Sequence, residues 1–448
     1  MSVETTPAQS SNGNGALMTP APRQSNLFAN RPFTLLWLGQ TISTLGTYIF
    51  DTTLVVWIAQ TLARGQSWAP LAVSGVFVAA ALPPLLLAPL AGVIVDRVSK
   101  RGAMLTADGL RALFTLAPLP LALGLRLPFI ANNPYGALGL IYAAVVALAI
   151  GQQFFSPAAL ALVGDLVSEE RQPQAQGALQ GGWSLATLAG PAIAPPLLLA
   201  FGPQWALIIN AASFLVSFVA LLAMGRLPTR SAADDQARRG FASELREGIL
   251  YLLRSRILRT LAIVSGLALL GVGALNAIDI FFTLRNLHTP IAEYGLLNTT
   301  FGVGLIAGSI GAGALAKRVG LGPLFAWGTF FAGALVMVYA RLDSFVPALV
   351  VLLLIGAPFA ATQVAAGPLI LRETPKRLVG RVESLMQPVS TAAMLVGAAL
   401  AGYLDSGPLR GFHARLVAFT FGPVDTIYLA VGALIALGGA YALARLRK

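Results

Sequence analysis

Twelve apolar stretches of about 20 to 30 residues follow one another along the chain from residue 33 onward. At 1.5 Å per residue, a helix of this length crosses a hydrocarbon core about 30 Å thick. Only 11% of the 448 residues are charged, whereas about 25% is usual for a protein whose surface faces water. The pattern predicts an all-α membrane protein with twelve transmembrane helices. The expected spans are 33–62, 71–95, 103–125, 137–163, 178–201, 205–225, 257–284, 292–316, 324–342, 346–371, 384–404 and 424–444.

Polar segments divide these spans into domains. Residues 1–30 are rich in Ser, Thr, Asn, Pro and Gly, lack the pattern of a signal peptide, and are expected to form a disordered cytoplasmic tail. The polar stretch 226–256 is predicted to link an N-terminal six-helix half, 31–225, to a C-terminal six-helix half, 257–448. The outside segment 406–423 has two interpretations, a short interfacial helix or a plain loop.

The basic residues set the orientation. The net charge of +12 would suggest nucleic-acid binding if it gathered on one water-facing domain. Instead, 23 of the 30 Lys and Arg residues fall in the terminal segments and loops of one face, and six fall on the other. This positive-inside pattern predicts a multi-pass protein of a bacterial-type inner membrane with both termini in the cytoplasm. Nucleic acid is excluded as a partner.

Several chemistries are ruled out by residue content. The chain has no cysteine and only two histidines, which excludes disulfides, thiolate metal sites and histidine clusters. The sequence offers no nucleophile–histidine pair, and it lacks the Gly-x-x-x-x-Gly-Lys-Ser/Thr loop that binds nucleotide. We therefore expect no enzyme activity, no catalytic residue, no metal and no cofactor.

A weak internal repeat relates the two halves. The segment Gly92-Val-Ile-Val-Asp96-Arg97-Val98 aligns with Gly313-Ala-Leu-Ala-Lys317-Arg318-Val319 at the end of the eighth span. Many transporters are built from repeated halves with the substrate between them. Two related halves joined by the linker are the simplest account.

The loop after the second span carries a specific signature. Its residues Gly92-x-x-x-Asp96-Arg97-x-x-Lys100-Arg101 resemble the loop motif between helices two and three of the major facilitator superfamily. The resemblance implies a transporter that works by alternating access. In such a loop, Asp and basic residues pair across the ends of neighbouring helices and act as part of a gate.

Within that superfamily the chain resembles the bacterial branch that includes macrolide and siderophore exporters. The likeness rests on Trp37-Leu-Gly-Gln40-Thr-Ile-Ser43-Thr-Leu-Gly46, Glu293-Tyr294-Gly295 and Gly380-Arg381-Val382. It implies proton-coupled efflux of an amphipathic or hydrophobic small molecule by a protein that acts as a monomer.

The sequence departs from the superfamily's proton-antiporter pattern at two places. Gly190-Pro191 resembles the start of the superfamily's antiporter motif, but Ala194-Pro195 replaces the usual Gly-Gly that follows. The fourth span, 137–163, also lacks the Arg that proton-coupled drug antiporters carry. If coupling occurs, other residues must carry it.

Four ionisable residues lie inside spans and away from their ends, where a charge costs roughly 2.5–3.5 kcal/mol and marks a candidate functional site. Asp108 and Arg111 have i, i+3 spacing and are predicted to pair in a structural or gating role. Asp51 has no sequence neighbour to pair with and is the best candidate proton or cation site, because withdrawal from water favours the neutral form of a carboxylate. The alternative is a residue wetted by water at the end of a cavity.

Asp279 in the seventh span occupies the position equivalent to Asp51 in the second half, so both are expected near a central cavity. A surface pair with Arg285 is the alternative. The uncharged polar residues offered as substrate contacts are Gln40, Gln152, Gln153, Asn276 and Gln363. Interhelical hydrogen bonding is an equally good explanation for them.

The function predicted from these features is secondary active efflux, with a small-molecule substrate, protons and membrane lipid as partners. A lipid or lysophospholipid translocator, or a small-molecule importer of the same fold, is the alternative. A receptor or scaffold without transport activity would have no need of lone carboxylates in the membrane.

Overall fold

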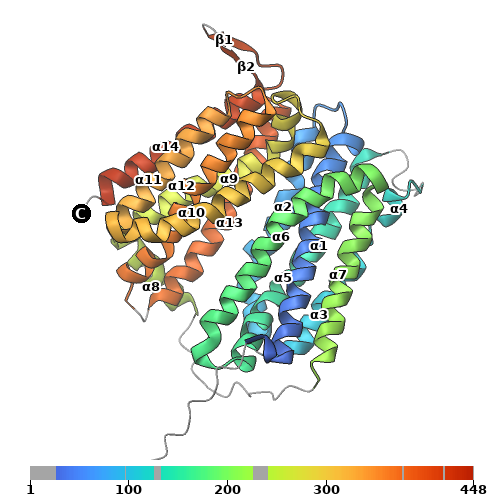
Figure 1. Ribbon diagram of the computed structural model, residues 1–448, viewed down its shortest axis with the longest axis vertical. Coiled ribbons are helices and arrows are strands. Elements are labelled where there is room, and N and C mark those ends of the chain that lie inside the picture. The colour runs from blue at the N-terminus through green and yellow to red at the C-terminus, as the bar shows by residue number, and fades with distance from the viewer. Residues whose placement is uncertain are drawn as a thin grey trace, which may run out of the picture.

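The computed structural model describes residues 27–95, 97–125, 133–225, 241–375, 378–416 and 419–446, which form a two-part helical bundle (Figure 1). The N-terminal half begins with the 3-10 turn η1 and ends with α7. Its elements are η1 (Leu27–Ala29), α1 (Arg31–Trp57), the π-helix η2 (Ile58–Leu62), α2 (Ala69–Val95), α3 (Lys100–Thr115), α4 (Leu119–Ala122), α5 (Pro134–Leu166), η3 (Glu169–Arg171), α6 (Gln172–Phe201) and α7 (Pro203–Ala223).

The C-terminal half begins with the amphipathic helix α8, which lies inside the predicted linker. Its elements are α8 (Phe241–Arg254), α9 (Arg256–Arg285), η4 (Ile291–Glu293), α10 (Tyr294–Val319), α11 (Leu321–Tyr339), α12 (Phe345–Glu373), α13 (Val379–Ser406), β1 (Ala414–Leu416), β2 (Phe419–Phe421) and α14 (Pro423–Leu446). Linker residues 226–240 and tail residues 1–26 lie outside the described residues.

Eleven helices among the described residues are long and apolar enough to cross a membrane. The third expected span, 103–125, is the exception, because α3 ends at Thr115 and only the single turn α4 follows it. Two causes are visible: α3 carries Asp108 and Arg111, and Pro118 and Pro120 interrupt the chain after it. Since α3 packs between α5 and α7, it still occupies the third place in a twelve-helix bundle.

In its described residues, the outside segment 406–423 forms neither the interfacial helix nor the plain loop that the sequence left open. It contains a short antiparallel β-hairpin in which Arg415 pairs with Thr420, and this hairpin projects from the bundle (Figure 1). We call the end of the molecule that carries residues 58–69 and 407–423 the hairpin end. The opposite end, with residues 97–99, 167–171 and 241–254, is the linker end.

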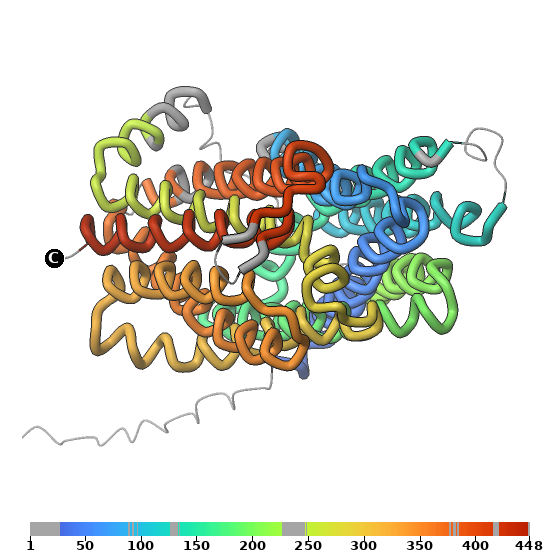
Figure 2. Tube along the Cα trace, turned by 90° about the horizontal axis from the view of Figure 1, so that it is seen from above, coloured from blue at the N-terminus to red at the C-terminus, as the bar shows by residue number. Residues whose placement is uncertain are grey.

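The two halves lie side by side when seen from above (Figure 2), and they meet at the hairpin end and diverge toward the linker end (Figure 1). At the contact, the backbone N–H of Leu71 donates to Ser406 Oγ at 2.9 Å, and Thr299 Oγ1 donates to the Leu188 carbonyl at 3.0 Å. One apolar cluster spans both halves there and includes Leu54, Ile58, Ile278, Phe281 and Phe282. The hairpin end is therefore closed by apolar packing.

Candidate functional site

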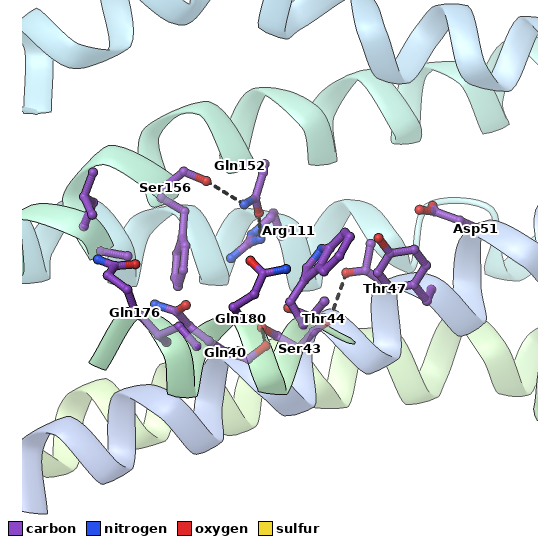
Figure 3. Close-up of a pocket in the computed structure, with 16 residues that line it drawn as sticks. Gln40, Ser43, Thr44, Thr47, Asp51, Arg111, Gln152, Ser156, Gln176 and Gln180 are labelled. Atoms are coloured by element: carbon purple, nitrogen blue, oxygen red, sulfur yellow. Dashed lines mark hydrogen bonds between the residues drawn. The ribbon is translucent and has the colours of Figure 1, made fainter. Parts of the chain in front are cut away.

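A cavity of about 460 Å³ is lined by helices α1, α3, α5 and α6 of the N-terminal half (Figure 3). Most of its lining residues are polar, and Asp51 and Gln176 lie at opposite ends of the row that Figure 3 labels. Because Gln176 belongs to the start of α6, its end of the cavity is nearer the linker end, and Asp51 lies toward the closed hairpin end. The polar and aromatic lining residues are Gln40, Ser43, Thr44, Thr47, Tyr48, Asp51, Arg111, Gln152, Phe155, Ser156, Gln176, Gln180 and Trp183.

Asp51 is exposed to this cavity, six residues before the end of α1. Within the described part of the chain its carboxylate forms no ion pair and no hydrogen bond. The rings of Tyr48 and Trp183 also line the cavity, with centroids 6.5 Å apart in an edge-on arrangement. The structure thus places a carboxylate without a cationic partner in a partly aromatic polar cavity.

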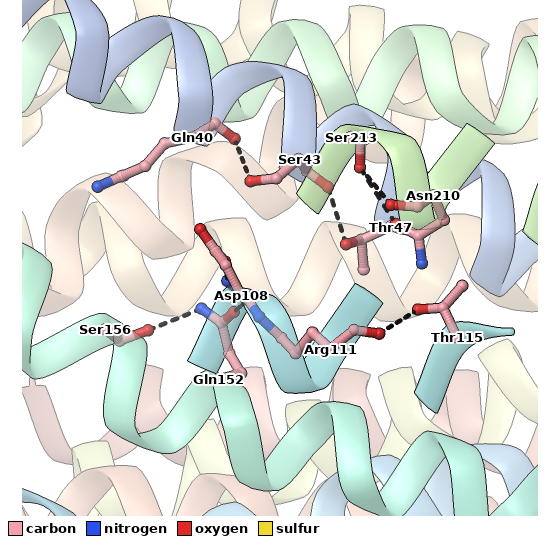
Figure 4. A network of polar contacts seen from close by, with 10 residues as sticks. All are labelled: Gln40, Ser43, Thr47, Asp108, Arg111, Thr115, Gln152, Ser156, Asn210 and Ser213. Carbon is pink, nitrogen blue, oxygen red and sulfur yellow. Dashed lines mark hydrogen bonds and ion pairs between the residues drawn. The ribbon is translucent and has the colours of Figure 1, made fainter. Parts of the chain in front are cut away.

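Asp108 and Arg111 form the predicted ion pair, deep in the N-terminal half (Figure 4). Their exposed fractions are 0% and 4%. Arg111 also donates to Gln152 Oε1, and its guanidinium lies between the rings of Phe155 and Phe214, 4.5 and 4.4 Å from their centroids. The charge of Arg111 is therefore neutralised locally, and the pair joins α3 to α5 and α7. A gating role stays a prediction, since all these contacts lie within one half.

The loop motif also binds neighbouring helices of its own half. Lys100 Nζ donates to Asp165 Oδ2 at 2.6 Å, which ties α3 to the end of α5. Arg101 donates to the carbonyls of Leu221, Leu222 and Gly225 at the end of α7. Cations at a helix C-terminus satisfy carbonyls that lack intrahelical partners. Gly92 lies in α2 and Arg97 follows it, whereas Asp96 falls outside the described residues.

Asp279 lies neither in the central cavity nor in a surface pair with Arg285, the two positions expected from the sequence. Tyr428 donates its hydroxyl to Asp279 Oδ1 at 2.7 Å, and the ring of Tyr428 stacks on Phe282 at a centroid distance of 4.6 Å. The alternative of a pair with Arg285 is wrong, because Arg285 binds Asp405 at 3.1 Å. Asp279 does not line the cavity that contains Asp51.

The predicted polar contacts separate into three groups. Gln40 and Gln152 line the Asp51 cavity, and the Gln40 amide nitrogen is buried without a hydrogen-bond partner among the residues that can be described. Gln363 lines a separate cavity of about 80 Å³ in the C-terminal half, beside Phe301 and Phe359. Gln153 and Asn276 line neither cavity.

Several cavity residues were missed by sequence reasoning. A signal for the α1 residues existed, because polar side chains recur at helical spacing on one face of an otherwise apolar helix. Tyr48 lies on the same face of α1, and Gln176 and Gln180 repeat the i, i+4 spacing on α6. The stripe on α1 is Gln40, Ser43, Thr44, Thr47 and Asp51.

The Gly190-Pro191 motif lies where α6 contacts both α1 and α10. A Cβ atom on Gly190 would come within 2.4 Å of the Tyr48 Cβ. From the other half, a Cβ atom on Gly295 would come within 2.0 Å of the Pro191 carbonyl oxygen. This motif therefore belongs to the contact between the two halves at the hairpin end.

No group of three or more His, Cys, Asp or Glu side chains that could hold a metal occurs within the described ranges. The polar residues of the cavity suit hydrogen bonding and charge neutralisation of a bound molecule. We find no constellation there that points to covalent chemistry.

The sequence is similar to those of several curated transporters. Curated relatives include the uncharacterized MFS-type transporter YkuC of Bacillus subtilis (strain 168), 22% identical over 92% of this chain and 91% of that protein. The enterobactin exporter EntS of Escherichia coli O1:K1 / APEC is 24% identical over 70% and 72%. Macrolide efflux protein A of Streptococcus pyogenes is 21% identical over 62% and 64%.

Solved structures show the same fold. A bacterial homologue of the iron transporter ferroportin, in an inward-facing state, superposes with a TM-score of 0.72 at 16% identity and covers 94% of this chain and 100% of that one. A bacterial homologue of the human lysosomal transporter Spinster, inward-facing and unoccupied, has a TM-score of 0.67 at 14% identity, with coverage of 93% and 97%. The family model of the Major Facilitator Superfamily matches residues 36–398. The chain belongs to the Major Facilitator Superfamily of membrane transporters.

Proposed function

We propose that this transporter exports an amphipathic or hydrophobic small molecule in exchange for protons, by alternating access. The observation that carries the proposal is Asp51, a lone carboxylate in a polar cavity whose far end is closed by apolar packing. Efflux relatives, a macrolide exporter and an enterobactin exporter, support the direction of transport.

The walls of the two halves favour an amphipathic substrate. The N-terminal half contributes four glutamines, Gln40, Gln152, Gln176 and Gln180, to its cavity. The cavity of the C-terminal half is lined mainly by aliphatic and aromatic side chains, among them Phe301 and Phe359. A ligand held between the two would meet hydrogen-bonding groups on one side and apolar surface on the other.

Proton coupling is assigned to Asp51. Intramembrane carboxylates serve as proton relays in pumps and transporters. Arg111 lines the same cavity but is paired with Asp108. Among the described residues, no cationic side chain therefore neutralises the charge of Asp51. A proton and a cationic group of the substrate would neutralise the Asp51 carboxylate in turn. Asp279, bonded to Tyr428 at the hairpin end, is proposed as a second proton-carrying group.

The linker end is proposed to face the cytoplasm, because most basic residues lie in its loops. On this assignment the structure is open toward the cytoplasm. It would bind substrate there and release it after the hairpin end opens.

Replacing Asp51 with Asn is expected to abolish proton-coupled export while preserving folding and substrate exchange. The measurement uses everted membrane vesicles with a lumen acidified by respiration, and erythromycin or enterobactin as candidate substrate. Substrate should release protons from vesicles with the parent protein and leave the lumen pH unchanged with Asp51→Asn. Asp279→Asn should give a partial response in the same assay.

The matched control is Asp343→Asn, which removes an exposed carboxylate in the loop before α12. It should behave as the parent. Unchanged proton release by Asp51→Asn would remove Asp51 from the mechanism. Movement of a fluorescent lysophospholipid without proton release would instead support a lipid translocator. Uptake of substrate from the hairpin side would support an importer.

A further inference from the structure

A second cavity, of about 500 Å³, lies in the cleft between the two halves at the hairpin end. The N-terminal half contributes residues between 59 and 69, from η2, the turn after it and the start of α2. The C-terminal half contributes the end of α9, together with Asp405, Arg410 and Pro423. The cleft therefore exists in this form only while the hairpin end is closed.

Three arginines line this cleft: Arg64 from the N-terminal half, and Arg285 and Arg410 from the C-terminal half. Only six basic residues are predicted on this side of the membrane, so half of them gather at one place. The positive-inside rule makes such a cluster uncommon on this face. It calls for an anionic partner.

The charges of the cleft are only partly compensated. Asp405 is bound by Arg285, and one nitrogen, Nη1, contacts both of its oxygens at 3.2 and 3.1 Å. Arg285 remains 46% exposed. Arg64 and Arg410 are exposed and form no ion pair with any residue whose position is described. Among the described residues, two guanidinium charges, one on each half, thus have no counterion.

Both of these arginines belong to turns whose backbones are hydrogen-bonded. Each is followed by a glycine with a φ of +72°, Gly65 and Gly411, a conformation that glycine adopts without strain. The Gln66 N–H donates to the Ala63 carbonyl at 3.0 Å, and the Arg410 N–H donates to the Gly407 carbonyl at 3.0 Å. The backbone therefore presents the two guanidinium groups from defined positions on opposite sides of the cleft.

We propose that this cleft binds a phosphate group, which bridges Arg64 and Arg410 and holds the hairpin end closed. Guanidinium groups match phosphate oxygens with paired, charge-assisted hydrogen bonds. Gln60, Gln66 and Ser67 line the same cleft and add neutral hydrogen-bonding groups. The phosphate is either a free anion or the headgroup of a phospholipid in the adjacent leaflet. Because the cleft widens when the halves part there, the ligand favours the conformation open at the linker end.

The test measures phosphate binding and the opening of the linker end in the full-length chain. Since the chain has no native cysteine, spin labels can be placed at Ser168→Cys and Lys317→Cys, one on each half at the linker end. Inorganic phosphate is titrated in a phosphate-free neutral detergent, with melting temperature and label distance as readouts. In a second arm, nanodiscs of phosphatidylglycerol are compared with nanodiscs of a phosphate-free galactolipid.

Phosphate is expected to raise the melting temperature and to increase the population with long label distances. Arg64→Gln and Arg410→Gln should each lower the apparent affinity for phosphate about tenfold or more, because one charged hydrogen-bonding partner is lost. Arg259→Gln, which removes an exposed arginine at the linker end, should respond as the parent. A response to free phosphate identifies a soluble anion, and a response only in phosphatidylglycerol identifies the headgroup.

The proposal is overturned if neither arm responds, or if Arg259→Gln loses the response as much as the cleft variants. The proposed site does not depend on the direction or coupling of transport. A protein that binds phosphate without moving protons would contradict the proposed function and leave the cleft assignment standing.

Discussion

Replacing Gly295 with leucine is expected to reduce transport strongly while the protein still folds and inserts. A Cβ atom at this position would lie 2.0 Å from the Pro191 carbonyl oxygen of the other half. A backbone atom cannot turn aside as a side chain can, so the halves must separate at the hairpin end. An overpacked contact costs about 1–3 kcal/mol, which lowers the population of the closed hairpin end about 5- to 150-fold. Transport requires that state once in every cycle.

The measurement combines substrate efflux from cells with the spin-label distance across the linker end. Gly311→Leu is the control on the same helix, because a side chain there would meet open space. The control should transport as the parent, and Gly295→Leu should shift to short label distances. Full transport by Gly295→Leu would show that the contact between α6 and α10 is not part of the cycle.

Removing one partner of the Asp108–Arg111 pair is expected to destabilise the protein by about 3–5 kcal/mol, because an uncompensated charge stays buried. Asp108→Asn and Arg111→Gln should each show this loss in thermal unfolding of detergent-solubilised protein. The double variant should recover much of it, since two neutral side chains leave no unpaired charge. The stacking of Arg111 between Phe155 and Phe214 is lost in either case, so recovery stays incomplete.

Lys100→Gln provides the comparison for this pair. Lys100 and Asp165 are 30% and 22% exposed, and solvent-exposed pairs contribute about 0–1 kcal/mol. Equal losses for Lys100→Gln and Arg111→Gln would contradict the claim that burial makes the Asp108 pair sensitive. Additive losses in the double variant would show that the two side chains act independently.

The architecture was predictable because hydropathy is a local property of the chain. Apolar stretches located the helices, and the division into halves at the polar stretch 226–256 stays a prediction. The third span shows the limit of this reasoning. Asp108 and Arg111 lower its hydropathy, and Pro118 ends α3 early, yet packing between α5 and α7 keeps α3 in the bundle. The β-hairpin at 414–421 was missed, because its strands are only three residues long.

The site was predictable only where a charge stood out. Asp51 and Arg111 could be selected because ionisable groups are rare in apolar helices. Their surroundings could not be selected, since partners in space lie far apart in sequence. Asp279 binds a hydroxyl 149 residues away, and Arg285 binds a carboxylate 120 residues away. Which uncharged polar residues face the cavity depends on how α1, α5 and α6 rotate against one another.

The apolar closure of the hairpin end also shapes the electric field across the protein. Water in the cavity would bring the electrical potential of the linker side close to Asp51, so the membrane voltage would fall mainly across the packed layer beyond it, which includes Leu54, Ile58, Ile278 and Phe281. A proton that reaches Asp51 from the hairpin side would cross nearly the whole field, worth about 2.3 kcal/mol for each 100 mV. The position of Asp51 on the linker side of this layer thus determines how strongly voltage, apart from the pH gradient, can drive the proposed exchange.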